Sequence, residues 1–170
     1  GYDLMSSMQL DSVYLQPVRV PQWVRGDVEK VHWKDKDGNT KSTNCTALGG
    51  STGTNGIIKG KVVEIKSWKE LDSLGEANLK GKIVFFNRPM NPTYISTFMA
   101  YGSCVDQRVN GALRAGLYGA KAVVVGSMTL KLDQNPDCGS MSYVDSIPKI
   151  PAAAISSKDA HELSKALKNN

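Results

Sequence analysis

Few side chains in this sequence belong to the types that hold metal ions. The only histidines are His32 and His161, and the three cysteines, Cys45, Cys104 and Cys138, lie far apart without a Cys-x-x-Cys pair. A structural zinc site needs four such ligands at characteristic spacings, which these residues lack. We therefore expect no metal site in the chain. The cysteines could be three free thiols, or one disulfide with a free thiol.

A nucleophile is the second chemistry to consider. Ser103 and Cys104 are adjacent, and His161 could serve as their base. The sequence around Ser103 lacks the Gly-x-Ser-x-Gly turn that exposes a catalytic serine, and no acidic residue is placed to orient the histidine. Cys104 is expected to pack near the start of a helix. We therefore expect no catalytic residue in this chain.

Glycines raise a third possibility, a nucleotide site. Residues 111–126 read GALRAGLYGAKAVVVG, a helical pattern followed by a buried strand. In a dinucleotide fold the glycines lie before the helix, where its amides face the phosphates. Here Gly116 and Gly119 lie at the end of the helix, so they should end and pack it. The glycine-rich loop at 48–56 is followed by a strand, and not by the helix of a phosphate-binding loop.

Charge and hydropathy exclude further classes. The net charge is +5, from 21 basic and 16 acidic residues, and the lysines alternate with acids as in Lys34-Asp35-Lys36-Asp37. Such interleaving is typical of a solvated surface and does not indicate a nucleic-acid partner. No apolar run approaches the roughly 20 residues needed to span a bilayer.

The first third of the chain is predicted to be antiparallel. The run SVYLQPVRV at 12–20 looks like a strand, and apolar and polar residues alternate at 28–33, as in a half-buried strand. Asp37-Gly38 suits a hairpin turn that returns through 40–46. A further strand is expected at 57–65.

The rest of the chain alternates strands and helices, which predicts a mixed α/β fold. A strand buried on both faces at 83–86 should lie near the centre of a sheet, and a strand-helix-strand order predicts a right-handed crossover. The elements expected here are a short helix capped by Ser67 at 67–71, the strand at 83–86, a helix at 101–118, strands at 122–125 and 152–155, and a helix capped by Ser156.

Three segments in order carry a resemblance to a known domain. They are GKIVFFNRP at 81–89, GALRAGLYGAKAVVV at 111–125 and IPKIPAAAISSKDAHEL at 147–163, and together they resemble the protease-associated domain. More narrowly, PVRVPQWVRG at 17–26 and LGGSTGT at 48–54 are similar to segments of carboxypeptidase-Q-like dizinc peptidases, in the aminopeptidase and glutamate carboxypeptidase group. The resemblance covers nearly the whole chain.

The resemblance implies both a fold and a domain organisation. The fold would be a swivelling β/β/α arrangement, a small open barrel or sandwich flanked by helices, with an N-terminal antiparallel strand pair. Residues 1–46 would be a helix end and a strand pair leading out of a peptidase domain, and residues 47–170 would be the protease-associated domain. The parent would be secreted, or periplasmic in the cell envelope, although this sequence contains no leader-like segment.

The resemblance also implies where the chemistry lies. The family's His-x-Asp motif and adjacent Glu-Glu pair are absent here, so two zinc ions are expected in a downstream peptidase domain and no cofactor in this chain. We therefore expect a non-catalytic lid that shapes substrate access to a zinc aminopeptidase or carboxypeptidase. Its partners would be the peptidase domain of the same chain and peptide substrates.

Candidate recognition residues follow the buried strand at 83–86. Loops at the carboxyl ends of central strands present side chains in α/β folds, and this loop carries Asn87, Arg88 and Tyr94. Arg88 could hold a peptide carboxylate by a two-pronged contact, and Tyr94 could wall the pocket. Alternatively, Arg88 pairs with a local acid and Tyr94 packs on its own loop.

Two wider alternatives remain open. The chain could be a free-standing module that binds peptides or proteins along an exposed strand edge. The strands of the first 46 residues could also leave an unpaired edge that drives formation of a homodimer.

Overall fold

The structure, a computed structural model, describes residues 1–169. Its elements in chain order are α1 (Tyr2–Ser7), β1 (His32–Lys34), β2 (Thr40–Ser42), β3 (Cys45–Ala47), β4 (Val62–Ile65), α2 (Trp68–Leu79), β5 (Ile83–Phe86), α3 (Thr97–Gly102), α4 (Asp106–Leu117), β6 (Ala122–Gly126), β7 (Ala152–Ile155) and α5 (Ser157–Lys168).

A five-stranded sheet holds the body together, in the order β3-β7-β6-β5-β4. Strands β4 to β7 are parallel, and β3 runs antiparallel to β7. A separate antiparallel pair joins β1 to β2. The mixed α/β class and the N-terminal strand pair are thus confirmed, and the sheet formed by the described residues is open, not a closed barrel. The central strand is β6, with β5 beside it.

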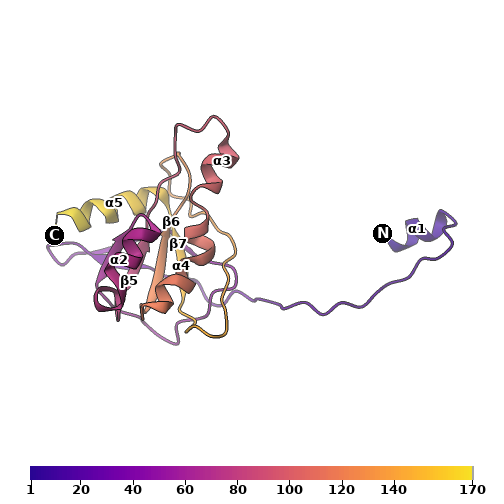
Figure 1. The fold of residues 1–170 in the computed structure, drawn as a ribbon, viewed down its shortest axis with the longest axis horizontal. Coiled ribbons are helices and arrows are strands. Elements are labelled where there is room, and N and C mark those ends of the chain that lie inside the picture. The colour runs from indigo at the N-terminus through magenta and orange to yellow at the C-terminus, as the bar shows by residue number, and fades with distance from the viewer. Residues whose placement is uncertain (170) are drawn as a thin grey trace.

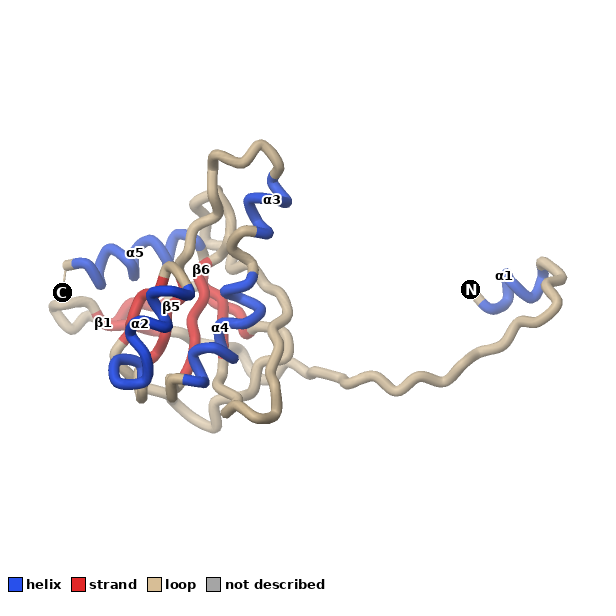
Figure 2. Tube along the Cα trace, viewed as in Figure 1, coloured by secondary structure: helices blue, strands red, loops and turns tan. Residues whose placement is uncertain are grey.

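Helices cover the two faces of this sheet unequally (Figures 1 and 2). Helices α2 and α4 connect successive parallel strands in one direction and pack on the same face, as expected for crossovers of one hand. Helix α5 follows the last strand and packs on the other face. The buried residues shared between α2, α4 and the first face include Leu71, Leu79, Ala112, Ala115, Val84, Phe86, Val123 and Val125. Those shared between α5 and the second face include Phe85, Val124, Ile155, Ala160 and Leu163. Alternate residues of β5 and β6 therefore serve opposite faces, which explains their unbroken apolar sequence.

The helix boundaries follow the predicted local chemistry. Ser67 accepts a hydrogen bond from the Glu70 amide at the start of α2, and Ser156 accepts one from the Asp159 amide at the start of α5. Gly119 follows α4 with φ +70°, the left-handed region that favours glycine. A Cβ on Gly116 would lie 2.9 Å from the Pro148 carbonyl oxygen. These two glycines therefore end and pack the helix, as predicted.

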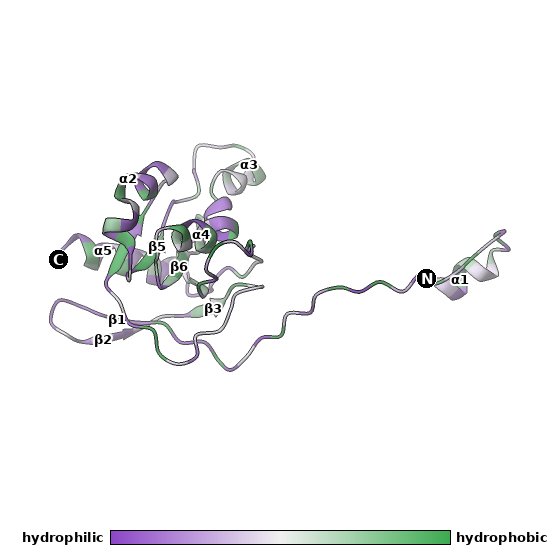
Figure 3. Cartoon of the chain, turned by 60° about the horizontal axis from the view of Figure 1, so that its bottom comes forward, coloured by the Kyte–Doolittle hydropathy of each residue, from purple (hydrophilic) through white to green (hydrophobic). Residues whose placement is uncertain are grey.

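Several predicted elements differ from those observed. The strand predicted at 12–20 is wrong, because that segment runs extended and exposed without a strand partner among the described residues. Figure 3 shows it as a long connection between α1 and the body. The strands predicted at 28–33 and 57–65 are shorter in the structure, where β1 covers His32–Lys34 and β4 covers Val62–Ile65. The single helix predicted at 101–118 is two helices, α3 and α4, separated at residues 103–105.

Helix α2 extends eight residues beyond the predicted segment and contains Gly75 at φ +58°. Among residues 1–169, no helix combines the length and hydropathy needed to cross a membrane.

Candidate functional site

The carboxyl edge of the parallel strands is where the candidate residues lie. Strand β5 leads into a loop and α3, and β6 leads into the segment that starts at Ser127. Because parallel strands end at the same edge, these two connections lie side by side. Figure 1 shows α3 standing away from the sheet at this edge. We call residues 89–105 the arm; they follow Asn87 and Arg88, include α3, and end just before α4.

Asn87 is tied into the scaffold below the arm. Its Nδ2 donates a 2.7 Å hydrogen bond to Glu64 Oε1 on β4, and the same oxygen accepts a 2.7 Å bond from Ser164 Oγ on α5. A Cβ on the neighbouring Gly126 would lie 2.8 Å from Asn87 Oδ1. Asn87 therefore joins β4, β5 and α5, and its amide donor is already engaged.

Arg88 is paired with a local acid, the alternative that the sequence left open. Its guanidinium forms an ion pair with Asp106 and lies 5.8 Å from the centre of the Trp68 ring. Trp68 Nε1 in turn donates a 2.6 Å bond to Asp106 Oδ2. The Arg88 side chain is 24% exposed. A peptide carboxylate would therefore have to compete with Asp106 for this guanidinium.

A buried glutamine fixes the backbone of Arg88. Gln107 is 2% exposed; its Oε1 accepts a 2.9 Å bond from the Arg88 amide, and its Nε2 donates a 2.8 Å bond to the Arg88 carbonyl oxygen. Gln107 therefore pairs with Arg88 as a neighbouring strand would. Neither Gln107 nor Asp106 was predicted to lie at this site, since nothing in their spacing from Arg88 indicates contact.

Tyr94 is the most accessible of the three candidate residues. It is 42% exposed, and no hydrogen bond of its hydroxyl to a described residue is present. It lies just before α3, whose first turn is capped by Ser96 Oγ. Tyr94 is therefore free to contact a ligand, whereas Asn87 and Arg88 are held by neighbours.

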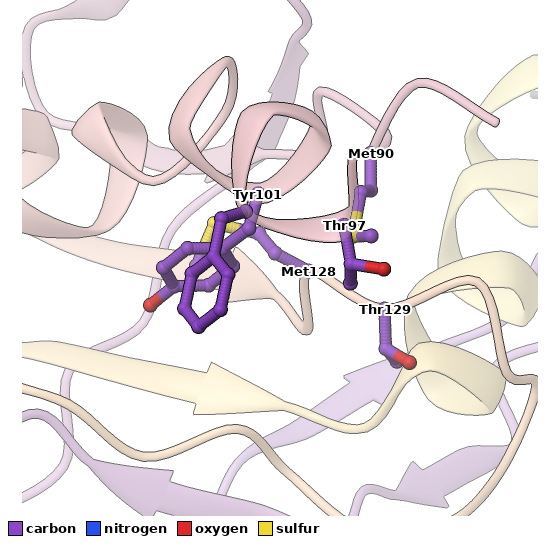
Figure 4. A pocket seen from close by; sticks show the side chains of 6 residues that line it. Met90, Thr97, Tyr101, Met128 and Thr129 are labelled. Carbon is purple, nitrogen blue, oxygen red and sulfur yellow. The ribbon is translucent and has the colours of Figure 1, made fainter. Parts of the chain in front are cut away.

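A hollow of about 350 Å³ separates the arm from the segment after β6. Figure 4 shows Met90 and Tyr101 of the arm facing Met128 and Thr129. The lining residues are Met90, Thr97, Phe98, Tyr101, Met128 and Thr129. Met90 and Met128 also belong to a small buried cluster with Ala100 and Cys104. The sequence carried one signal of this feature, an uncharged run at 89–105.

The residues considered as a nucleophile are engaged elsewhere. Cys104 is fully buried, its Sγ lies 3.3 Å from the Tyr101 carbonyl oxygen, and burial raises the pKa of its thiol. Ser103 Oγ donates a 2.7 Å bond to the Ala100 carbonyl oxygen. His161 is exposed on α5 and makes no hydrogen bond to either residue. The structure therefore does not assemble a nucleophile and base from these residues.

Metal ligands are similarly dispersed. His32 on β1 and His161 on α5 are both exposed. Across residues 1–169, no three His, Cys, Asp or Glu side chains come close enough together to hold a metal ion. The three cysteines are free thiols, with Cys138 exposed and Cys45 half-buried.

Comparison with known proteins assigns the chain to a family. No protein-family model matches it. Carboxypeptidase Q of Xenopus laevis is 36% identical over 166 residues, which cover 96% of this chain and 33% of that protein. Carboxypeptidase Q of Homo sapiens is 31% identical over 166 residues, covering 96% and 32%. The chain is a homologue of part of carboxypeptidase Q. It spans about a third of the length of these relatives.

Solved structures agree with this similarity to part of a carboxypeptidase Q-like peptidase. The peptidase M28 precursor from Shewanella amazonensis SB2B is similar over 99% of this chain and 37% of its own, with a TM-score of 0.78 and 29% identity. An aminopeptidase from Aneurinibacillus sp. strain AM-1 matches 83% of this chain and 30% of its own, with a TM-score of 0.50 and 14% identity, which shows a shared fold alone. The resemblance to carboxypeptidase-Q-like peptidases that the sequence indicated is thus confirmed.

Proposed function

We propose that this chain is a protease-associated domain that acts as a non-catalytic lid of a secreted zinc exopeptidase related to carboxypeptidase Q. The observation that carries the proposal is the similarity to carboxypeptidase Q of Xenopus laevis, which covers 96% of this chain but only a third of that protein. The remaining two thirds of such a peptidase leave room for a separate catalytic domain.

The donor set of the chain supports a division of labour. A pair of zinc ions that activates water for peptide hydrolysis is held by histidine nitrogens and carboxylate oxygens. The dispersed side chains of residues 1–169 offer no such group. We therefore assign both zinc ions to the peptidase domain, and no catalytic step to the described residues.

The lid would act through the carboxyl edge of the sheet. The arm there is anchored at its base by Gln107 and by the Arg88–Asp106 ion pair. A rigid projection next to an active-site entrance would narrow it and exclude bulky substrates. Among the candidate substrate-binding residues, Tyr94 is the one with an exposed side chain, so we expect it to contact peptides more readily than Asn87 or Arg88.

The domain division remains part of the proposal. Residues 1–46 would lead out of the peptidase domain and residues 47–170 would form the lid. Strand β3 crosses this division, and Trp33 and Cys45 pack on the cluster beneath α5. The strand pair of β1 and β2 would therefore move with the lid as one unit, even though residues 1–46 connect the lid to the peptidase domain.

Zinc content and activity test the proposal directly. We would measure both for this chain and for the full-length peptidase, using unblocked dipeptides as substrates. We expect two zinc ions and hydrolysis from the full-length protein only. Stoichiometric zinc binding at micromolar affinity, or dipeptide cleavage by this chain alone, would falsify the lid assignment.

Variants of the full-length protein then test substrate contact. We expect Tyr94→Ala to change the relative kcat/KM for dipeptides of different size. Tyr14→Ala is the matched control, since Tyr14 is 76% exposed in the extended N-terminal segment. Equal kcat/KM ratios in both variants and the unmodified protein would remove Tyr94 from the proposed site.

A further inference from the structure

The arm is unlike the rest of the chain in its charge. Charged residues make up 22% of the chain, so a stretch of 17 residues would carry about four, yet residues 89–105 contain no Asp, Glu, Lys, Arg or His. The arm nevertheless stands away from the body (Figures 1 and 2). A projecting segment is normally polar, because it is surrounded by water.

Large apolar side chains are exposed on the arm. Ile95 is fully exposed, Phe98 is 88% exposed and Met99 is 62% exposed. These three residues lie within five positions of one another, next to the hollow lined by Met90 and Tyr101. Single exposed apolar residues are common, but three large ones so close in sequence, beside an apolar hollow, indicate an interaction surface.

The arm is held in place from below. Met90, Ala100 and Cys104 are buried against Met128, and Ser96 caps the first turn of α3. Together with the two hydrogen bonds between the Gln107 side chain and the Arg88 backbone, these contacts fix both ends of the arm. Its exposed side chains are therefore pre-organised, which lowers the entropy lost on association.

We propose that the arm docks on the peptidase domain of the same polypeptide. This inference rests on the proposed function in one respect, that the chain is joined to such a domain. The curated relatives are about three times as long as the matched segment, so in them a homologous unit is tethered to further protein. The core of a lasting interface is depleted in charge, as the arm is.

The size of the patch favours a tethered partner over a second copy of the chain. Three large side chains offer on the order of 500 Å², whereas a stable complex of separate proteins buries about 800 Å² on each partner. A tether raises the effective concentration to about the millimolar range. A patch too small for a homodimer is therefore sufficient for docking within one chain.

The chemistry of the patch also disfavours a peptide as its occupant. The short peptides that an exopeptidase cleaves carry charged termini, and residues 89–105 have no charged side chain to meet them. The only side-chain hydroxyls lining the hollow besides that of Tyr101 are those of Thr97 and Thr129. A buried apolar protein surface suits these residues better than a charged ligand does.

Photo-crosslinking in the full-length protein tests the docking. We would replace Phe98 with p-benzoylphenylalanine, irradiate a mixture of ¹⁴N- and ¹⁵N-labelled protein with an unblocked dipeptide added, and map the products by mass spectrometry. The control is the same replacement at Ile57, which is also 88% exposed but lies far along the chain in a loop before β4. We expect crosslinks from position 98 to residues outside these 170, within one isotopic label, at least tenfold above the yield from position 57.

Three results would overturn the docking proposal. They are crosslinks of mixed isotopic label, which indicate a second copy; crosslinks only to an added dipeptide; and a yield at position 98 no higher than that at position 57. Because the readout does not depend on activity, it separates the two proposals. Intrachain crosslinks combined with unchanged dipeptide selectivity in Tyr94→Ala would keep the docking and reject substrate contact by Tyr94.

A charged variant adds a second, independent measurement. Phe98→Asp in the full-length protein should increase amide exchange of residues 95–99 at least tenfold, because the docked surface would be released. Ile57→Asp should leave exchange of the arm unchanged. Equal exchange of residues 95–99 in both variants and in the unmodified protein would contradict the proposal.

Discussion

At the scale of single residues, Gln107 connects the scaffold to the proposed site. Its amide satisfies both backbone groups of Arg88 while being almost fully buried. An apolar side chain of similar size would leave these two groups without their partners, and each unsatisfied buried group costs about 1–3 kcal/mol.

We therefore expect Gln107→Leu to lower the free energy of unfolding by about 2–3 kcal/mol, measured by urea denaturation. The matched control is Gln134→Leu, because Gln134 is exposed and a surface substitution should stay within about 0.5 kcal/mol. An equal effect of the two substitutions would show that the hydrogen bonds of Gln107 to the Arg88 backbone contribute nothing to stability.

The thiols should differ in reactivity in the order of their burial. The attacking species is the thiolate, and burial raises the pKa of both Cys104 and Cys45. With iodoacetamide at pH 8, we expect Cys138 to be modified first, Cys45 more slowly, and Cys104 only when the fold opens. Mass spectrometry of timed samples measures the order. Early labelling of Cys104 would contradict its buried position.

The raised pKa of the Cys104 thiol also makes the stability of the fold depend on pH. The folded pKa of Cys104 lies above its unfolded value of about 8.5. Its contribution to stability is thus fully present below that pH and is lost as the pH rises, because the unfolded state ionises first.

At the scale of elements, local capping chemistry predicted where helices begin. Ser67 Oγ accepts a 3.1 Å bond from the Glu70 amide, and Glu70 Oε2 accepts a 2.7 Å bond from the Lys66 amide. These two contacts form a reciprocal cap of the kind that fixes a helix start. They also position Trp68, which lies beside the guanidinium groups of Arg88 and Arg114.

We expect Ser67→Ala to destabilise the chain by about 1 kcal/mol, through loss of the cap. Ser73→Ala in the same helix is the control; Ser73 is exposed, and alanine is the better helix former by a few tenths of a kcal/mol. Thermal unfolding followed by circular dichroism compares the two. A loss for Ser73→Ala as large as that for Ser67→Ala would mean that the hydroxyl at position 67 is not acting as a cap.

The elements that were predicted correctly are those whose neighbours are close in sequence or whose composition is unambiguous. The runs at 83–86 and 122–126 are apolar throughout, so burial on both faces followed directly. The run at 12–20 looks like a strand in sequence, but pairing depends on a partner edge that the described residues do not supply. Arg88 illustrates the same limit at the site, since its partners Asp106 and Gln107 approach it only after α4 packs on the sheet.

At the scale of the whole molecule, the N-terminal segment is connected to the body only from Trp23 onward. None of the hydrogen bonds or ion pairs among residues 1–169 joins residues 1–22 to the sheet. Trp23 Nε1 then donates to the Ser51 carbonyl oxygen, and Glu29 Oε1 accepts a 2.9 Å bond from the Ala47 amide. Residues 23–31 therefore lie along β3, whereas the residues before them do not contribute to the body.

We expect removal of residues 1–22 to leave the melting temperature of the chain unchanged to within about 1 °C. Removal of residues 1–30 should lower it by about 4–8 °C, because the hydrogen bonds of the Trp23 indole and of the Ala47 amide are both lost, each is worth about 1 kcal/mol, and 1 kcal/mol corresponds to about 2–4 °C for a chain of this size. Differential scanning calorimetry measures both. A large fall for the shorter deletion would reveal contacts of the N-terminal segment that this arrangement does not contain.

The pairing of β3 with β7 has a consequence for how the chain is made. Strands β4, β5, β6 and β7 pair with their neighbours in the order in which they leave the ribosome, so each can join a growing sheet as it emerges. Strand β3 is synthesised before all of them, yet its partner in the sheet follows about a hundred residues later. At roughly 5–20 residues per second, β3 and the strand pair before it wait about 5–20 seconds for that partner. A nascent chain that has emerged from the ribosome only as far as residue 151 should therefore hold β4, β5 and β6 together while everything N-terminal to β4 is still open to a chaperone or a protease.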